Sequence, residues 1–139
     1  MKIMVDVNIV IDVAEERAGF VEASSGVLEV IFAHRVAACF VSHAVTTTYF
    51  LVKRSSGKGR AEDVIDEILA HFVIVPSTKE LMLRARKSLV SDFEDAIVAV
   101  AADMLKCEFI VTRDVGDFKH SAVKAIRPEE FMRLVERLN

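Results

Sequence analysis

The sequence predicts an α/β sandwich in which helices cover a buried parallel β-sheet. Short apolar runs rich in Val, Ile and Phe alternate with longer stretches in which apolar residues recur every three or four positions. The short runs are apolar at nearly every position, which is typical of parallel strands covered on both faces. The longer stretches have the periodicity of amphipathic helices, and these helices provide the cover.

Five strands and six helices follow from these patterns. The strands are expected at residues 3–5, 37–41, 72–75, 109–111 and 122–126. The helices are expected at residues 21–34, 43–53, 61–71, 78–89, 92–106 and 128–138. Pro128 suits the first turn of the last helix, because its ring fixes φ and its missing N–H is not needed there.

Length and composition indicate one domain over residues 1–139. A chain of 139 residues has about the commonest domain size, and its 53% hydrophobic content excludes a disordered chain. No apolar run approaches the roughly 18 residues that a membrane span needs. Asp6 interrupts the start of the chain before the apolar region of a signal peptide could form. We therefore expect a cytoplasmic protein with no membrane partner.

Several common site types do not fit the sequence. Cys39 and Cys107 lie far apart and match no CxxC pattern, so they are expected to be core thiols. The four histidines show no HxxxH or similar spacing, which argues against the usual zinc hydrolases and nucleophilic triads. A net charge of −3 does not create the positive field of a DNA-binding module. Any nucleic-acid contact must therefore use a local basic patch or bound cations.

Acidic residues follow two of the expected strands and begin one helix. Asp6 comes directly after the first strand, and Asp114 and Asp117 follow the fourth. The carboxyl ends of parallel strands meet at one edge of a sheet. The helix over 92–106 leads by a short turn into the fourth strand, so Asp92 and Asp95, on one face of its first turn, return to that edge. We expect these five carboxylates in one region.

A hard divalent cation would relieve the repulsion between such carboxylates. Like charges at short range raise one another's pKa, whereas Mg²⁺ or Mn²⁺ takes oxygen ligands and leaves positions for water and a phosphate oxygen. The implied chemistry is metal-assisted phosphodiester hydrolysis. Taken singly, Asp92 has an equally good interpretation as a helix-start residue, because residues 91–94 fit the capping box S-x-x-E. Asp6, Asp114 and Asp117 taken singly also suit turns.

Three segments resemble the signature segments of PIN-domain proteins. They are DVNIVID at residues 6–12, DFEDA at 92–96 and IVTRDVGDF at 110–118, and the resemblance spans essentially the whole chain. It implies a Rossmann-like three-layer α/β/α sandwich with a central parallel sheet. It also implies a Mg²⁺- or Mn²⁺-dependent ribonuclease that acts on single-stranded RNA. Many bacterial members are toxins, so an antitoxin partner and a homodimer are implied as well.

The resemblance assigns roles to individual residues. It implies that Asp6, Asp95 and Asp114 are the catalytic, metal-binding acids, and that Asp92 and Asp117 are further metal ligands.

Supporting roles are implied for Asn8, Asp12 and Thr48. PIN ribonucleases often carry a Glu six residues after the serine that follows the second strand, but six residues after Ser42 this chain has Thr48. A hydroxyl is a poorer, neutral ligand. A catalytically weakened PIN-like protein that binds RNA or a protein partner is therefore the alternative.

Basic residues near the expected site are candidate phosphate contacts. One dense cluster occupies residues 53–60, expected as a loop between two helices, and a solvated helix connection also explains it. The candidates for RNA binding are Lys53, Arg54, Lys58 and Arg60 in this cluster, and Arg113 and Lys119 beside the acids. A phosphoacceptor receiver domain is a second alternative of similar length. It would need paired acids after the first strand, where Asp6 is followed by Val7.

Overall fold

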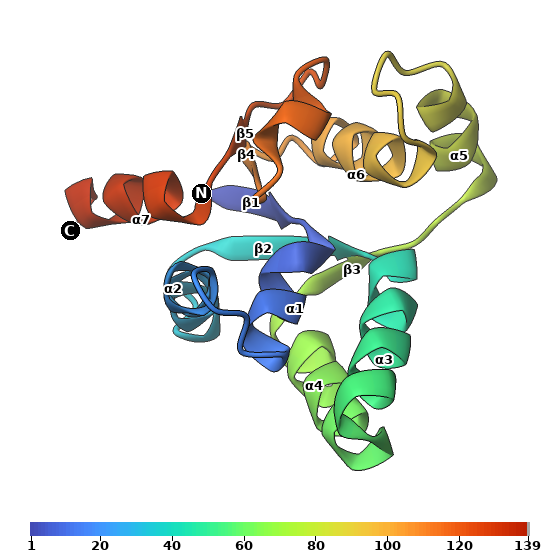
Figure 1. Ribbon diagram of the computed structural model, residues 1–139. Helices are drawn as coiled ribbons and strands as arrows, with labels where there is room; N and C mark the ends of the chain where they lie inside the picture. The colour runs from blue at the N-terminus through green and yellow to red at the C-terminus, as the bar shows by residue number, and fades with distance from the viewer. Residues whose placement is uncertain (139) are drawn as a thin grey trace.

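A parallel five-stranded sheet forms the centre of the protein. The computed structural model describes residues 1–138, and its strand order is β3-β2-β1-β4-β5. The strands are β1 Lys2–Val5, β2 Ala37–Val41, β3 Val73–Val75, β4 Phe109–Val111 and β5 Ala125–Ile126. Figure 1 shows helices on both faces of this sheet, with α1 to α4 on one side and α5 and α6 on the other. The predicted three-layer α/β/α sandwich is confirmed.

Seven α-helices and one short 3-10 helix surround the sheet within residues 1–138. They are α1 Val7–Ala14, α2 Val21–Phe32, α3 Ser42–Ser56, α4 Lys58–His71, α5 Lys79–Arg86, α6 Phe93–Met104, η1 Val115–Phe118 and α7 Pro128–Arg137. None of these helices combines the length and apolar character that crossing a bilayer requires.

The sheet is buried on both faces, as the continuous apolar runs predict. Ile3, Met4 and Val5 of β1 are at most 1% exposed, and Phe40 and Ile110 of the flanking strands are fully buried. Parallel pairing brings the carboxyl ends of β1 and β4 level, with Val5 opposite Val111. The residues that follow these two strands therefore meet at one edge, called here the carboxyl edge.

Helix α1 is present in the structure but was not predicted from the sequence. Its run VNIVIDVA is rich in β-branched residues and has buried side chains on most of its surface, so it lacks the periodicity of an amphipathic helix. The helix begins because Asp6 caps it: the Asp6 Oδ1 accepts a hydrogen bond of 2.8 Å from the Val7 N–H.

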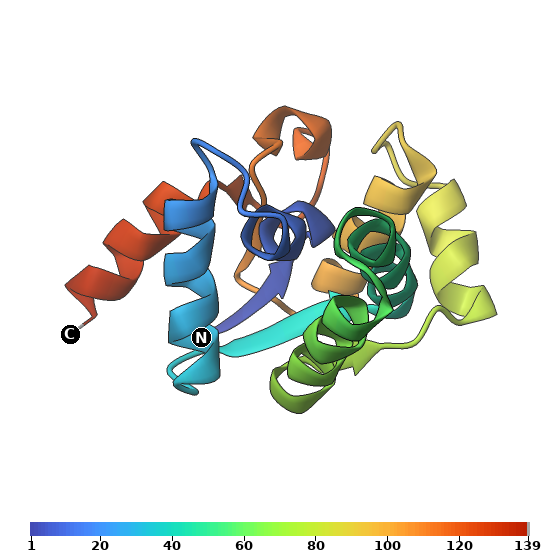
Figure 2. The ribbon, with the colours of Figure 1, turned by 60° about the horizontal axis from the view of Figure 1, so that its bottom comes forward.

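The basic segment 53–60 is helical at both ends, so the prediction of a loop there is wrong. Helix α3 continues to Ser56 and α4 starts at Lys58, and only Gly57, at φ +87°, interrupts them. Figure 2 shows α3 and α4 packed side by side as a hairpin.

Strand β5 is also shorter than predicted. Residues 122–124 lie outside it, because the Ser121 Oγ accepts a hydrogen bond from the Val123 N–H in a turn. Cys39 and Cys107 are buried free thiols, as expected.

Candidate active site

Asp6 lies at the carboxyl edge, between the end of β1 and the start of α1. It is 7% exposed. Its Oδ1 caps α1, and its Oδ2 accepts a hydrogen bond of 2.8 Å from the Thr112 Oγ1. Burial raises the pKa of Asp6; the hydrogen bonds from Thr112 and Val7 oppose this effect, while the charges of Asp114 and Asp117 add to it.

Asp92 is the N-cap of α6, which confirms its interpretation as a helix-start residue. Its Oδ1 accepts a hydrogen bond of 3.0 Å from the Asp95 N–H. Asp95 is half-buried in the first turn of α6, and its own carboxylate makes no side-chain hydrogen bond within residues 1–138. Its carboxylate oxygens are therefore free to accept a ligand.

The five predicted acids act on one another electrostatically. Burial raises the pKa of Asp95 to about 7, together with the charges of Asp6, Asp92, Asp117 and Asp114, in decreasing order of effect. Charges reach a common carboxyl group in this way only when their segments fold close together. The structure thus brings the acids of three separate segments into one region, as the sequence analysis expected.

Asn8 ties the segment after β4 to helix α1. Its Nδ2 donates to the Asp114 Oδ2 at 3.0 Å, and also to the Thr112 Oγ1 at 3.4 Å. The Thr112 Oγ1 accepts a further hydrogen bond of 3.0 Å from the Asp114 N–H. Asn8 and Thr112 therefore orient Asp6 and Asp114, and Thr112 is a site residue that the sequence analysis missed.

A small cavity of about 30 Å³ opens beside Asp6 and Asp95. Three of its other lining residues, His43, Thr47 and Glu94, were not predicted. The first two lie on α3, which starts directly after β2 and so at the same carboxyl edge. This position was the signal in the sequence that could have indicated them. His43 and Glu94 also line an adjoining open groove of about 440 Å³.

Thr48 does not face this cavity. It is fully buried, and its Oγ1 donates a hydrogen bond of 2.7 Å to the Ala44 carbonyl one turn earlier in α3. Thr47, the next residue toward the helix start, lines the cavity instead. A role for Thr48 as a supporting ligand is therefore not compatible with this geometry.

Asp12 also lies apart from the cavity, on the buried face of α1. It is fully buried, and its Oδ2 accepts a hydrogen bond of 2.9 Å from the Arg113 Nε. Burial raises the pKa of Asp12, and the charge of Arg113 opposes this rise. Asp12 is thus part of an internal ion pair, and Arg113 is its partner.

The basic segment 53–60 lies away from the acids. The charge of Arg54 acts on Glu15, at the end of α1 opposite to Asp6. The Lys53 Nζ lies 5.8 Å from the centre of the Tyr49 ring. Arg60 lines a cavity of about 500 Å³ between α1, α2 and α4.

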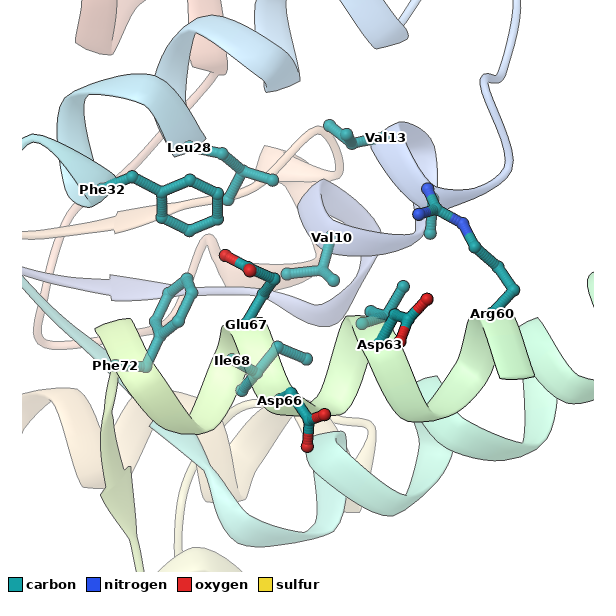
Figure 3. A pocket seen from close by; sticks show the side chains of 12 residues that line it. Val10, Val13, Leu28, Phe32, Arg60, Asp63, Asp66, Glu67, Ile68 and Phe72 are labelled. Atoms are coloured by element: carbon teal, nitrogen blue, oxygen red, sulfur yellow. The ribbon is translucent and has the colours of Figure 1, made fainter. Parts of the chain in front are cut away.

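Figure 3 shows this cavity, which has mostly apolar walls. Phe32 and Phe72 lie at one end, and Arg60 and Asp63 lie at the other. Lys58 and Lys119 are exposed. Of the six predicted phosphate contacts, Arg113 and Lys119 are the two that follow β4 in the chain, at the carboxyl edge.

The donor set at the carboxyl edge fits a hard divalent cation. It consists of carboxylate oxygens, and burial together with the charges of the neighbouring acids raises the pKa of Asp95. Within residues 1–138, no three His, Cys, Asp or Glu side chains are arranged as a ready coordination set. Asp6, Asp92 and Asp114 each accept a hydrogen bond from a protein donor in this structure.

Comparison with known proteins identifies similar chains over most of the sequence. Residues 2–116 match the sequence pattern of the PIN domain family. Ribonuclease VapC1 from Aquifex aeolicus (strain VF5) is 24% identical over 135 residues, covering 94% of this chain and 92% of that protein.

Solved structures with this fold come from several bacteria. VapBC2 from Rickettsia felis, bound to a DNA fragment from its promoter, has a TM-score of 0.69 at 17% identity and covers 91% of this chain and 98% of that chain. A toxin-antitoxin complex from Klebsiella pneumoniae has a TM-score of 0.68 at 20% identity, covering 90% and 96%. VapC20 from Mycobacterium tuberculosis, a toxin that cleaves the sarcin-ricin loop, has a TM-score of 0.63 at 16% identity, covering 78% and 86%.

Proposed function

Because this chain belongs to the PIN domain family, we propose that it hydrolyses phosphodiester bonds of single-stranded RNA with a bound Mg²⁺ or Mn²⁺. One observation carries the proposal: the acids of three segments meet at the carboxyl edge, where burial and the charges of the other four acids raise the pKa of Asp95 to about 7. The similarity to a ribonuclease over nearly the whole chain supports the same activity. Because the chain belongs to the PIN domain family, the alternative of a phosphoacceptor receiver domain is not pursued.

The residues that would hold the cation are Asp6, Asp95 and Asp114, with Asp92 and Asp117 nearby. When bound, such a cation activates water and neutralises the charge that develops on the phosphate. The protein's own contribution is orientation. Thr112 holds the Asp6 carboxylate by a hydrogen bond of 2.8 Å, and Asn8 holds that of Asp114 by one of 3.0 Å.

The open groove beside the acids supports a single-stranded substrate. Met82 and Phe93, which line it, are 40% and 42% exposed. Ser42 and Ser77, also in the groove, are joined by a hydrogen bond of 2.7 Å. Partly exposed apolar side chains beside hydroxyl groups suit an unpaired base, which can stack and also form hydrogen bonds. A paired base in a duplex would not present its face to them.

Two partners complete the proposal. Similar solved structures are toxin-antitoxin complexes, which supports a cytoplasmic toxin that binds an antitoxin protein. A homodimer is also part of the proposal, and the exposed apolar side chains of Phe50, Leu83 and Leu89, at 67%, 54% and 78% exposed, are candidate contacts for it.

A cleavage assay on the purified protein tests the activity. The substrate is an unstructured, fluorescently labelled RNA, with DNA of the same sequence as its control. We expect cleavage of the RNA with Mn²⁺ or Mg²⁺, none with EDTA, and none by Asp95→Asn. Asp103→Asn, at an exposed position near the end of α6, is the matched control and should remain active.

Two outcomes of this assay would contradict the proposal. Cleavage that persists in EDTA or in Asp95→Asn would exclude the assigned site. Binding of RNA without any cleavage would favour the alternative, a PIN-like protein that only binds.

A further inference from the structure

Asp12 carries a buried charge that depends on an arginine from a distant segment. Its side chain is fully buried, and its Oδ2 accepts hydrogen bonds from the Arg113 Nε at 2.9 Å and the Ser24 Oγ at 3.4 Å. Its Oδ1 lies 3.7 Å from the Arg17 Nη1 and has no hydrogen-bond partner within residues 1–138. A buried carboxylate is tolerated only with a charged partner, and the closest one is Arg113.

Arg113 stands in the chain between two residues of the acid site. Thr112 donates a hydrogen bond of 2.8 Å to Asp6, and Asp114 accepts one of 3.0 Å from Asn8. The Arg113 N–H itself is 3.5 Å from the Asn8 Oδ1. The three successive residues after β4 are thus each attached to α1 or to its cap. The ion pair of Arg113 reaches one helical turn beyond Asn8 and so secures the segment at a second point.

The guanidinium of Arg113 is held on two sides. Its Cζ lies 4.5 Å from the centre of the Phe20 ring, and the side chain is 21% exposed. Arginine stacks on a ring and donates to a carboxylate with the same planar group, which the compact ammonium of lysine cannot do. The guanidinium is therefore already in contact with Asp12 and Phe20, and it is a poor candidate for the phosphate contact predicted from the sequence.

We infer that Asp12 and Arg113 are positioning residues that keep Asp114 in place against Asp6. The pair acts through the backbone between Thr112 and Asp114 and does not touch the substrate. The inference rests on the proposed function for its effect on metal binding and catalysis. The effect of the ion pair on the segment from Thr112 to Asp114 can be measured even if the protein binds no metal and cleaves no RNA.

The test compares Asp12→Asn and Arg113→Lys with Arg17→Gln. Arg17 is the matched control, because it also approaches Asp12 but comes from the turn after α1 and forms its other ion pair with Glu15, outside the segment from Thr112 to Asp114. We expect both pair variants to bind Mn²⁺ about tenfold more weakly, which is typical of residues that orient metal ligands. With RNA, kcat should fall while KM stays constant. Hydrogen–deuterium exchange at the amides of Arg113 and Asp114 should accelerate, and Arg17→Gln should match wild type in every measurement.

The double variant Asp12→Asn/Arg113→Lys checks that the two residues act as one unit. We expect it to lose no more Mn²⁺ affinity than the more affected single variant, because coupled residues are not additive. Phe20→Leu is a milder variant, at a residue 41% exposed, for use if the pair variants do not fold. It removes the ring without uncovering a charge, and it should accelerate the same exchange to a smaller extent.

Two results would overturn the inference. One is a higher KM for Arg113→Lys with unchanged kcat and Mn²⁺ affinity, which would place Arg113 on the substrate. The other is a lower Tm for the pair variants without faster exchange at residues 113–114, which would mean general stabilisation only. If wild type neither binds Mn²⁺ nor cleaves RNA, the proposed function fails, and the exchange data alone decide the inference.

Discussion

At the scale of single residues, Asp95 accounts for much of the electrostatic strain at the carboxyl edge. Its carboxyl group is half-buried and lies in the field of four other aspartates. Its tendency to hold a proton is therefore much higher in the folded protein than in the unfolded chain. A raised folded-state pKa makes the stability of the metal-free protein depend on pH.

Replacing Asp95 should remove part of the dependence of the protein's stability on pH. Its pKa is about 7 in the folded state against an ordinary value of 3.8, so the folded state binds the extra proton between these values. Stability is therefore lost as pH rises from about 4 through 7. We expect Asp95→Asn, in EDTA, to exceed wild type in Tm by more at pH 8 than at pH 5. Melting curves of both proteins at the two pH values check this, and an equal gap would contradict it.

The site residues differ in how far the sequence could predict them. Asp6, Asp95 and Asp114 were predictable, because strand ends and a helix start place them at one edge whatever the details of packing. The orientation of each side chain was not predictable. Thr48 turns to its own helix backbone and Thr47 faces the cavity, a difference of one residue that depends on how α3 packs.

At the scale of elements, single residues at helix ends determine where a helix starts or stops, which hydrophobic periodicity does not show. The strands were largely correct because buried parallel strands are apolar throughout, as β1 is. Helix α1 was missed because its run of Val and Ile has strand propensity, and the cap formed by Asp6 sets its start. The break between α3 and α4 was misplaced because one residue, Gly57, is enough to make it.

Two glycines in the α3–α4 hairpin should respond in opposite ways to alanine. Gly57 has φ +87° and ψ 169°, a conformation that L-residues rarely adopt, and nothing lies within 4 Å of an added Cβ. Gly57→Ala should therefore destabilise by about 1–3 kcal/mol through backbone strain alone. Gly59 is helical and equally open, so Gly59→Ala should stabilise by about 0.4–1 kcal/mol. Urea denaturation measures both, and a shift of the same sign would contradict the assigned backbone.

At the scale of the whole molecule, the fold works by bringing distant segments to one edge of the sheet. Residues near positions 6, 95 and 114 meet there because β1 and β4 are parallel neighbours and α6 returns to their carboxyl ends. The meeting of the acids could be predicted from this topology. The hydrogen bonds that hold Asp6 and Asp114 could not be predicted, since they depend on the donors Thr112 and Asn8.

The central claim is that a divalent cation binds among these acids and relieves their mutual repulsion. The most direct test is the melting temperature of wild type and Asp95→Asn at neutral pH, with EDTA or with millimolar Mn²⁺. A ligand that binds the folded state stabilises it by about 2.7 kcal/mol at 100 times its Kd. We expect Mn²⁺ to raise the Tm of wild type by several degrees and to leave that of Asp95→Asn nearly unchanged. An unchanged wild-type Tm, or an equal rise in both proteins, would contradict it.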